Sequence, residues 1–401
     1  MMLIESSLGL PFVLFLFILP FPGTVSLRLL CLAAAFLLAL AYSRRWSPPS
    51  VPCKPSILAW VLVTAASVAY SFDPAYSMGE FKNEILYSLA AYWAFFVFVR
   101  GERELRALLI GLGAAVAVVA VWGVADTVYE GIWVEDAGHG GSAAISAFLA
   151  AAAPLFATAL FARPNRPVRL ALWAVLVLIV LTAIITRQRI LWPVFLIETA
   201  LGAALLQRVG LVRWSARAGL SGASVAVLVA ALGFVGVQQW REYTHESRTI
   251  EADARLSVWP KAVDRIMERP WRGAGLGRQA MRKAYPDLLP PQDTLVWHAH
   301  NIFLNAGISM GLPGVAALLL LFGNFYLEYA RLAHAPERLA QIVGIAGILM
   351  LTGVIGRNLT NDFFVRDGSL LFWAINGALL GAGLRARSKS ANAIAGRQIA
   401  R

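Results

Sequence analysis

The stretch "LALWAVLVLIVLTAIITRQRILWPVFLIETALGAALL", Leu170 to Leu206, is apolar on both sides of a polar turn, "TRQR" at 186–189. Each side is about as long as the roughly 17–25 residues that a helix needs to cross a membrane. Neither side alternates polar and apolar residues as the strands of a membrane β-barrel do, and an open sheet edge is not tolerated in lipid. The stretch therefore predicts two membrane-spanning helices joined by a tight turn.

The rest of the chain has the same character. Of its 401 residues, 59% are hydrophobic and 14% are charged, and the mean hydropathy of +0.66 is far above that of a soluble domain. Apolar windows fall at 8–22, 25–43, 56–72, 84–99, 106–128, 143–161, 169–186, 190–206, 219–238, 303–329, 340–356 and 369–384. The predicted fold class is an all-α integral membrane protein of the inner-membrane type, with about twelve transmembrane helices. The first window ends in "PFPGT", without a small-residue cleavage site, and is expected to be a retained span.

The charges of the loops predict an orientation. Basic loops alternate along the chain with less basic ones, and the positive-inside rule places both termini in the cytoplasm. One long hydrophilic segment then falls on the outer side, between the ninth and tenth helices, and is expected to be largely helical. The expected organisation is helices one to nine over 1–238, an outer domain over 239–302, helices ten to twelve over 303–384 and a basic cytoplasmic tail over 385–401.

The outer segment is basic although the positive-inside rule does not require it. Its charges can form a solvated surface or contact anionic headgroups, and as a set they indicate an anionic partner on the outer side. Within it, "EADARLSVWPKAVDRIMERPW" (251–271) predicts an amphipathic helix that ends at Pro270, with Pro260 near its first turn. Its expected apolar face is Leu256, Trp259, Val263 and Ile266 or Met267. The ten basic residues are Arg241, Arg248, Arg255, Lys261, Arg265, Arg269, Arg272, Arg278, Arg282 and Lys283.

Two histidines stand where the outer segment returns to the membrane, in "HAHN" at 298–301. Imidazole titrates near neutral pH, so a histidine at a membrane-facing cleft can act as a general base toward a hydroxyl nucleophile. On a helix, residues two apart point in nearly opposite directions, so one of His298 and His300 is expected to face a given site. Asn301 and Asn305 could hold the ring or a sugar hydroxyl. The alternative is a hydrogen-bonded histidine at the interface, without a catalytic role.

Arg189 in the "TRQR" turn lies at the start of a span, where a charged side chain needs a partner or must snorkel to the interface. A bidentate guanidinium at this depth suits a lipid-linked diphosphate. Glu198 lies farther along the same span and is either functional or structurally paired.

The net charge of +12 follows the ordinary bias of membrane loops, so no nucleic-acid partner is expected.

Other classes of site find little support in the chain. The "GAGLG" loop at 273–277 follows no strand and lacks the P-loop lysine, which excludes nucleotide binding. The outer loops offer no acidic cluster or H-E-x-x-H motif, so no metal site is expected. Cys31 and Cys53 give neither a disulfide framework nor metal-ligand spacing.

Five motifs follow one another along residues 186–314. They are T-x-x-R-x-x-W (Thr186, Arg189, Trp192), R-x-x-x-W (Arg255, Trp259), P-x-x-G-x-G-x-G (Pro270, Gly273, Gly275, Gly277), H-x-H-N-x-x-L (His298, His300, Asn301, Leu304) and G-x-x-x-G-x-x-G (Gly307, Gly311, Gly314). In this order they resemble the O-antigen ligase and O-antigen polymerase superfamily of membrane glycosyltransferases. The twelve expected spans and the single large outer insertion agree with the same family. The sequence departs from the family pattern at Gln188, where Ser or Thr is common, and Arg187 is an alternative to Arg189 in the first motif.

The resemblance implies an enzyme of the bacterial inner membrane whose active site, in the insertion, faces the periplasm. It implies transfer of an O-antigen glycan from undecaprenyl diphosphate to a lipid A-core sugar hydroxyl, among membrane lipids and without metal or nucleotide cofactor. The family's catalytic histidine maps to His300, and its two arginines map to Arg189 and Arg255, as binders of the donor diphosphate. Supporting or weaker candidates are His298, Asn301, Arg265, Arg187 and Trp259.

Three rival functions stay open at this point. An O-antigen polymerase or a protein O-oligosaccharyltransferase would keep the chemistry and change the acceptor. A transporter of lipid-linked glycans would need no catalysis. Transporters tend to carry inverted repeats with broken helices at mid-depth. No such pairs of Gly- or Pro-interrupted segments are visible in the two halves of this chain, and its polar motifs lie at the outer interface.

Overall fold

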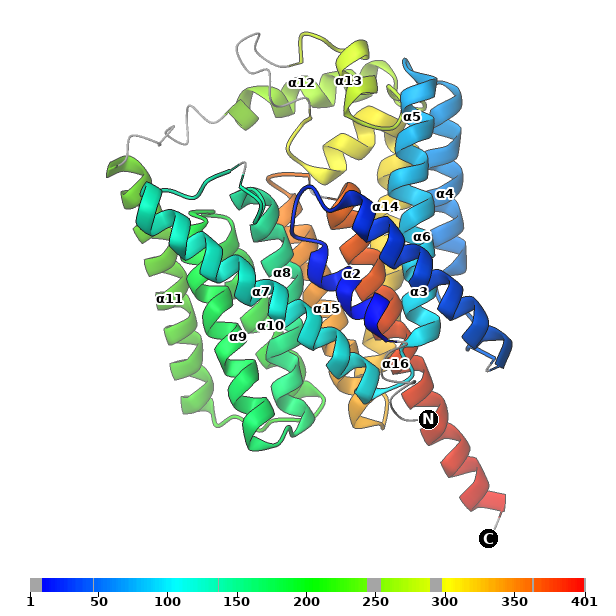
Figure 1. Ribbon diagram of the computed structural model, residues 1–401, viewed down its shortest axis with the longest axis vertical. Coiled ribbons are helices and arrows are strands. Elements are labelled where there is room, and N and C mark those ends of the chain that lie inside the picture. The colour runs from blue at the N-terminus through cyan, green and yellow to red at the C-terminus, as the bar shows by residue number, and fades with distance from the viewer. Residues whose placement is uncertain are drawn as a thin grey trace.

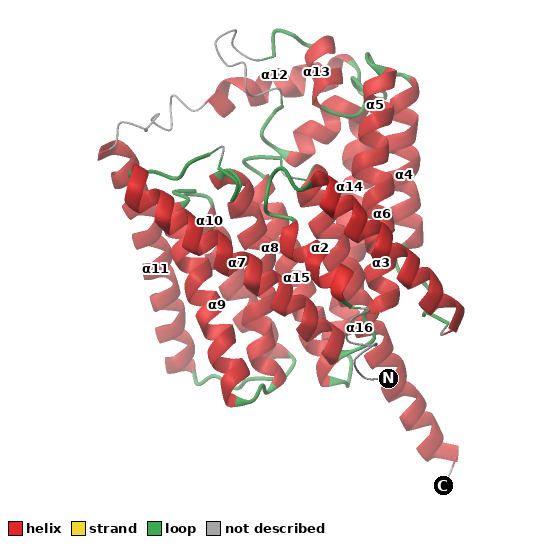
Figure 2. Ribbon diagram, in the orientation of Figure 1, coloured by secondary structure: helices red, strands yellow, loops and turns green. Residues whose placement is uncertain are grey.

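The computed structural model describes residues 9–45, 47–135, 137–243, 254–288, 298–362 and 364–399. Helix accounts for 79% of the structure, and this part of the chain holds no strand (Figure 2), so the all-α prediction is confirmed. Arg248 of the basic set lies outside the described residues, as do the side chains of Arg241 and Leu256. The elements are α2 (Leu10–Ile18), α3 (Val25–Arg45), α4 (Lys54–Ala69), α5 (Pro74–Glu80), the π-helix η1 (Phe81–Leu86), α6 (Tyr87–Phe98), α7 (Glu102–Glu130), α8 (Ser142–Ala159), the 3₁₀ turn η2 (Leu160–Ala162), α9 (Arg166–Ile185), α10 (Leu191–Arg208), α11 (Ala216–Tyr243), α12 (Ala254–Glu268), α13 (Arg278–Ala284), α14 (Ile302–Ala333), α15 (Arg338–Asn358) and α16 (Arg366–Ile399).

Eight of the described helices are long and apolar enough to cross a membrane, and Lys54–Ala69 is a shorter apolar helix. The chain is therefore a multi-pass membrane protein. A helix lies in every one of the predicted apolar windows, but some are short: α2 has 9 residues and α6 has 12. At 1.5 Å per residue, such helices do not cross a hydrocarbon core of about 30 Å alone. The number of twelve spans stays a prediction.

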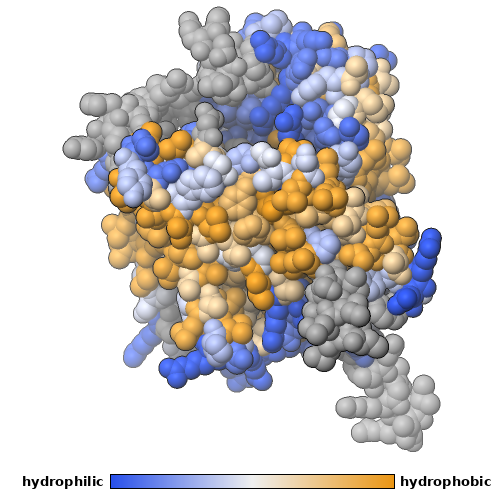
Figure 3. Space-filling model, viewed as in Figure 1, coloured by the Kyte–Doolittle hydropathy of each residue, from blue (hydrophilic) through white to orange (hydrophobic). Residues whose placement is uncertain are grey.

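The helices stand roughly side by side, with α9, α10 and α11 at one flank and α4 and α6 at the other (Figure 1). Helices α12 and α13 form a cap across one end, and both chain-end markers lie on the opposite side. An apolar band surrounds the middle of the face seen in Figure 3, with hydrophilic surface at both ends. This is the pattern of a bundle whose middle contacts lipid. Which end faces the cytoplasm stays a prediction.

Small residues allow the central helices to approach closely, as in other membrane bundles. A Cβ atom at Gly377 of α16 would lie 2.2 Å from the carbonyl oxygen of Tyr92 in α6. A Cβ atom at Gly347 of α15 would lie 2.3 Å from the ring of Tyr329 in α14. These contacts pack α14, α15 and α16 into a common core, from whose ends the loops of the polar site emerge.

Helix α14 is broken at Gly311, whose φ of 71° and ψ of −167° are not helical. The backbone groups released by this break bond to the glycine-rich loop that follows α12. Leu312 N donates to Pro270 O (2.6 Å), while Ala274 N donates to Ile308 O (2.7 Å) and Gly275 N donates to Ser309 O (2.8 Å). The P-x-x-G-x-G-x-G and G-x-x-x-G-x-x-G motifs are therefore two halves of one backbone contact.

The predicted amphipathic helix is present as α12, but of its expected apolar face Ile266 is buried while Val263 and Met267 are exposed. Val258, Ala262 and Ile266 are the buried stripe, whereas Val263 and Met267 are 47% and 63% exposed. The stripe faces α14, where Ile266 packs against Gly307. Both stripes have helical spacing, and only the position of α14 decides between them. Pro260 lies in the second turn rather than the first.

Replacing Gly275 by alanine is expected to lower the free energy of unfolding by about 2–5 kcal/mol. Its φ is +100°, and an added Cβ atom would lie 2.1 Å from the Ser71 hydroxyl oxygen and 2.6 Å from the Ser71 Cα atom. Thermal unfolding of the purified protein in detergent measures the effect. Gly79→Ala in α5 is the control, because no atom lies within 4 Å of its added Cβ. Equal melting temperatures for the two variants would contradict this packing.

Candidate active site

The histidine segment is not helical. Helix α14 begins at Ile302, after an N-cap at Asn301, and His300 has a φ of 50°, in the left-handed region. As a result the rings of His298 and His300 lie side by side, with centroids 4.0 Å apart. The expectation that helical geometry would separate the two rings is therefore wrong. A left-handed conformation at a residue other than glycine costs free energy and is often found at functional sites.

Two helices hold this segment by its middle residue, Ala299. The indole Nε1 of Trp259 in α12 donates to Ala299 O (2.8 Å). Ala299 N donates to the side-chain oxygen of Asn305 in α14 (2.7 Å), and Asn305 Nδ2 donates in turn to Asp362 Oδ2 (2.6 Å). The R-x-x-x-W motif thus places Trp259 on the backbone between the histidines. Asn305 and Asp362 position the same backbone from the other side.

Asn301 fixes the start of α14. Its side-chain oxygen accepts hydrogen bonds from Phe303 N (2.9 Å) and Leu304 N (3.2 Å), and its Nδ2 donates to Leu359 O (3.0 Å). These bonds orient the helix that follows the histidines and tie it to the end of α15. A contact of Asn301 with the imidazole or a sugar hydroxyl stays a prediction.

His298 is buried and neutral. Its burial, together with the neighbouring Arg278, His300 and Arg255, lowers the pKa of His298 to about 2. Its Nδ1 accepts a hydrogen bond from His300 N (3.2 Å), so the proton of the neutral ring is on Nε2. His298 therefore stays uncharged beside His300 at physiological pH.

Two arginines lie within electrostatic reach of His298, and a third lies within reach of one of these two. Arg255 at the start of α12 and Arg278 at the start of α13 both act electrostatically on His298. Arg357 at the end of α15 is 1% exposed and lies within electrostatic reach of Arg255. Its Nε donates to Ser146 Oγ of α8 (2.6 Å). The cluster concentrates positive charge around the imidazoles, as expected of a site for an anion.

The "TRQR" turn adjoins this cluster through Gln188, which accepts from Arg357 (3.2 Å) and donates to Ser142 Oγ (3.0 Å). Arg189 Nη1 donates to Gln238 Oε1 of α11 (2.5 Å). Arg187 is buried, with a φ of 52°, and donates to Gly131 O (2.8 Å). Arg187 therefore fixes the turn to the loop after α7, while Arg189 points to the flank formed by α11.

Arg265 lies near the far end of α12. It pairs with Glu268 and Asp287 and lies over the ring of Tyr285, with 5.6 Å from its guanidinium carbon to the ring centroid. These contacts link α12 to the segment after α13, and they do not bring Arg265 to the histidine segment. Its role as a supporting site residue stays a prediction.

Glu198 is buried in α10, 6% exposed. It packs against α15 so closely that a Cβ atom at Gly353 would lie against its carboxylate, and it is within electrostatic reach of Tyr326 in α14. The carboxyl group is therefore enclosed between helices of the bundle rather than placed beside the histidines.

Three residues of the site were missed as candidates by sequence reasoning: Arg278, Arg357 and Asp362. Arg278 was one of ten basic residues with no mark to single it out. Arg357 directly follows the apolar window 340–356, and a charge at the end of a span is a signal that could have identified it. Asp362 lies in a short polar loop between spans, and its contact with Asn305 is long-range. Burial raises the pKa of Asp362, and the Arg278 charge opposes that rise.

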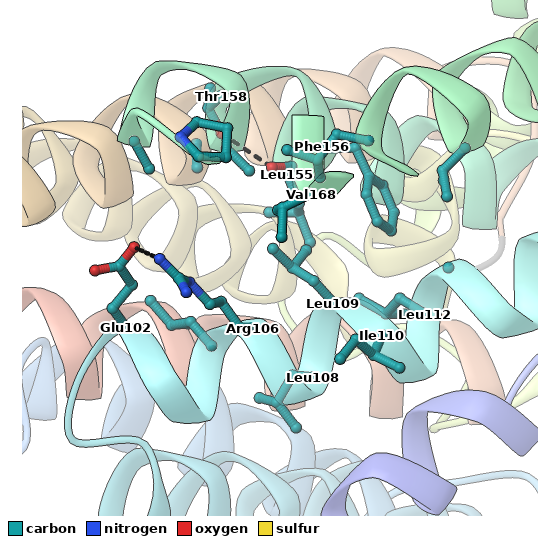
Figure 4. Close-up of a pocket in the computed structure, with 18 of the residues that line it drawn as sticks. Glu102, Arg106, Leu108, Leu109, Ile110, Leu112, Leu155, Phe156, Thr158 and Val168 are labelled. Carbon is teal, nitrogen blue, oxygen red and sulfur yellow. Dashed lines mark hydrogen bonds and ion pairs between the residues drawn. The ribbon is translucent and has the colours of Figure 1, made fainter. Parts of the chain in front are cut away.

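One large pocket is apolar and does not include the histidine cluster. It has a volume of about 710 Å³ and lies between α7, α8, α9, α15 and α16. Leu109, Leu112 and Phe156 line it, and the ion pair of Arg106 with Glu102 (2.6 Å) stands at one end (Figure 4). Such a lining offers contact to hydrocarbon chains and has no group placed for proton transfer from a sugar.

The chain was compared with known proteins. The model of the family described as O-antigen ligase matches residues 140–319. No curated protein matches the chain significantly. The matched region contains the "TRQR" turn, α12, the glycine-rich loop, the histidine segment and the broken part of α14. Members of this family carry out O-antigen ligase or polymerase-type reactions, which join a lipid-linked glycan to an acceptor. Residues 140–319 are thus similar to the O-antigen ligase family, and this match supports an O-antigen ligase/polymerase-like protein.

Proposed function

We propose that the chain is an O-antigen ligase that transfers a glycan from undecaprenyl diphosphate to a sugar hydroxyl of lipid A-core, on the periplasmic side of the inner membrane. The observation that carries this proposal is the placement of Arg255 and Arg278 within electrostatic reach of the paired histidines, with Arg357 within reach of Arg255. A cationic site beside a titratable imidazole, at one end of a membrane bundle, fits an anionic lipid-linked donor and a hydroxyl acceptor.

In the proposed reaction His300 removes the proton of the acceptor hydroxyl as that oxygen attacks the anomeric carbon of the donor. The bond from this carbon to the diphosphate breaks, and its electron pair leaves with undecaprenyl diphosphate. Arg189 and Arg255 bind the diphosphate and compensate the charge that develops on it. A direct displacement of this kind inverts the anomeric centre. Neutral His298 supports His300 by accepting its backbone N–H.

The test is the identity of the product. Purified full-length protein in nanodiscs is incubated with an undecaprenyl-diphosphate glycan and, in separate reactions, with lipid A-core, a second lipid-linked glycan or a pilin-like protein. The expected product is glycosylated lipid A-core, with release of one undecaprenyl diphosphate per glycan transferred, as measured by mass spectrometry. Reactions without acceptor are the control for hydrolysis of the donor.

Any other product would contradict the ligase function and identify a different one. A lengthened lipid-linked chain would identify a polymerase, and a glycosylated protein would identify an oligosaccharyltransferase. Absence of product with all three acceptors, together with movement of the donor across vesicle membranes, would identify a transporter.

A further inference from the structure

A second pocket lies next to the histidine segment, on the side of α4 and α5. It has a volume of about 250 Å³ and is enclosed by α4, α5, η1, α13, the first part of α14 and the loop before α16. Asn305 lines it, and the same side chain accepts the hydrogen bond of Ala299 N. The pocket therefore adjoins the backbone that carries His300. Its polar lining includes Glu80, Glu84, Arg278, Asn305 and Asp362.

Hydrogen-bond acceptors are concentrated in this pocket. Glu80, Glu84 and Asp362 are 6%, 8% and 6% exposed. Glu80 pairs with Arg366 (3.4 Å), which also lines the pocket. Glu84 lies in the π-helix η1, and π-helical turns often occur at functional sites. The pocket thus offers carboxyl oxygens from three positions.

Two N–H groups without a hydrogen-bond partner among the described residues line the same pocket. Trp60 is 6% exposed, and its indole Nε1 has no hydrogen-bond partner among the described residues. The Nε atom of Arg278 likewise lacks one within the described chain. A buried N–H group without a partner is rare in proteins, and each case needs a reason. Here two of them belong to the lining of one pocket.

We propose that this pocket binds one sugar ring of the acceptor saccharide, an inference that rests on the proposed transferase function. A sugar hydroxyl both donates and accepts hydrogen bonds, so a neutral polyol can use the carboxyl oxygens and the two unused N–H groups together. The volume corresponds to about eight water molecules at ~30 Å³ each, which is the scale of a single sugar ring.

The position of the pocket in the bundle assigns it to the acceptor rather than to the donor. Arg189, one of the two residues proposed for the diphosphate, contacts α11. Arg357, which lies within electrostatic reach of the other one, Arg255, contacts α8. The pocket instead opens among α4, α5 and α13, which lie toward the other flank of the bundle (Figure 1). Asn305 joins the pocket to the histidine segment, so an acceptor sugar in the pocket would lie next to the backbone that carries His300.

The experiment measures binding, so it does not depend on turnover. The probes are lipid A-core oligosaccharide freed of its acyl chains and, separately, undecaprenyl diphosphate, each titrated into the full-length protein in nanodiscs. Trp60→Phe removes the indole N–H and keeps an aromatic ring of similar shape. We expect the Kd for the oligosaccharide to rise about three- to tenfold, as for the loss of one buried hydrogen bond, and the Kd for undecaprenyl diphosphate to change less than twofold.

Trp373→Phe in α16 is the matched control. Its indole Nε1 is also buried without a partner among the described residues, but Trp373 lies in the aromatic core of the bundle, against Phe325 and Tyr92. It should leave both Kd values unchanged. An oligosaccharide Kd unaffected by Trp60→Phe, or affected equally by Trp373→Phe, would overturn the inference while the transferase function stands. A selective effect on undecaprenyl diphosphate would move the pocket to the donor. Oligosaccharide binding that depends on Trp60 in a protein without transfer activity would reject the proposed function and leave the pocket as a saccharide site.

Discussion

His300→Asn is expected to reduce the rate of glycan transfer about 10²–10⁴-fold, the usual contribution of a general base. Asparagine is the better replacement than alanine, because His300 has a φ of 50° and asparagine tolerates the left-handed region. The backbone of the segment should then be retained, and with it the hydrogen bond from His300 N to His298. The measurement is single-turnover transfer from an undecaprenyl-diphosphate glycan, with donor binding determined on the same sample.

His334→Ala is the matched control for this loss. His334 is exposed and follows the last residue of α14, while His300 stands just before its first residue. Beyond its break at Gly311, α14 continues to Ala333, which is about 33 Å at 1.5 Å per residue, so His334 is remote from the proposed chemistry. Its replacement should leave transfer unchanged. Full transfer activity of folded His300→Asn protein would remove His300 from the role of base.

The sequence predicted the parts of the fold that depend on local composition. The apolar windows coincide with helices because about twenty consecutive apolar residues have few alternatives in a membrane. The break in α14 was not predicted, since "GISMGLPG" is compatible with a continuous, closely packed helix. It depends on Pro270, Ala274 and Gly275, which take over the hydrogen bonds of the released backbone groups. That exchange joins segments about 40 residues apart, beyond the reach of any local pattern.

The candidate site was likewise predicted from the sequence only in part. The motifs identified His298, His300, Arg255 and the "TRQR" turn as parts of one site, and the structure places His298, His300 and Arg255 together. The relative placement of the rings was wrong because it assumed a helix, whereas the N-cap at Asn301 starts α14 after the histidines.

Arg357 was missed because its contacts are distant in the sequence. Its partners Ser146 and Gln188 are 211 and 169 residues away along the chain. No spacing rule covers such distances, and the contacts appear only when α8, the "TRQR" turn and α15 come together.

Arg255→Ala is expected to lower kcat/KM for the lipid-linked donor about 10²–10³-fold, the size of effect seen when one charge-stabilising donor is removed from a reaction site. Arg255 adds a positive charge beside His298 and Arg357, and the proposed diphosphate would lie against this cluster. Arg255→Lys keeps the charge but loses the planar, bidentate geometry, so an intermediate loss of about tenfold is expected. Lys261→Ala removes an exposed charge from the same helix and is the control for a general loss of basic surface.

Donor binding separates the role of Arg255 from that of His300. A residue that binds the diphosphate should, when removed, raise the Kd for undecaprenyl diphosphate together with the loss of turnover. A base should leave that Kd unchanged, because the deprotonated hydroxyl belongs to the acceptor. If Arg255→Ala binds undecaprenyl diphosphate as tightly as the unmodified protein but transfers poorly, then Arg255 acts on the histidine segment, through its charge next to His298, and the diphosphate must be held by Arg189 and the arginines that remain in the cluster.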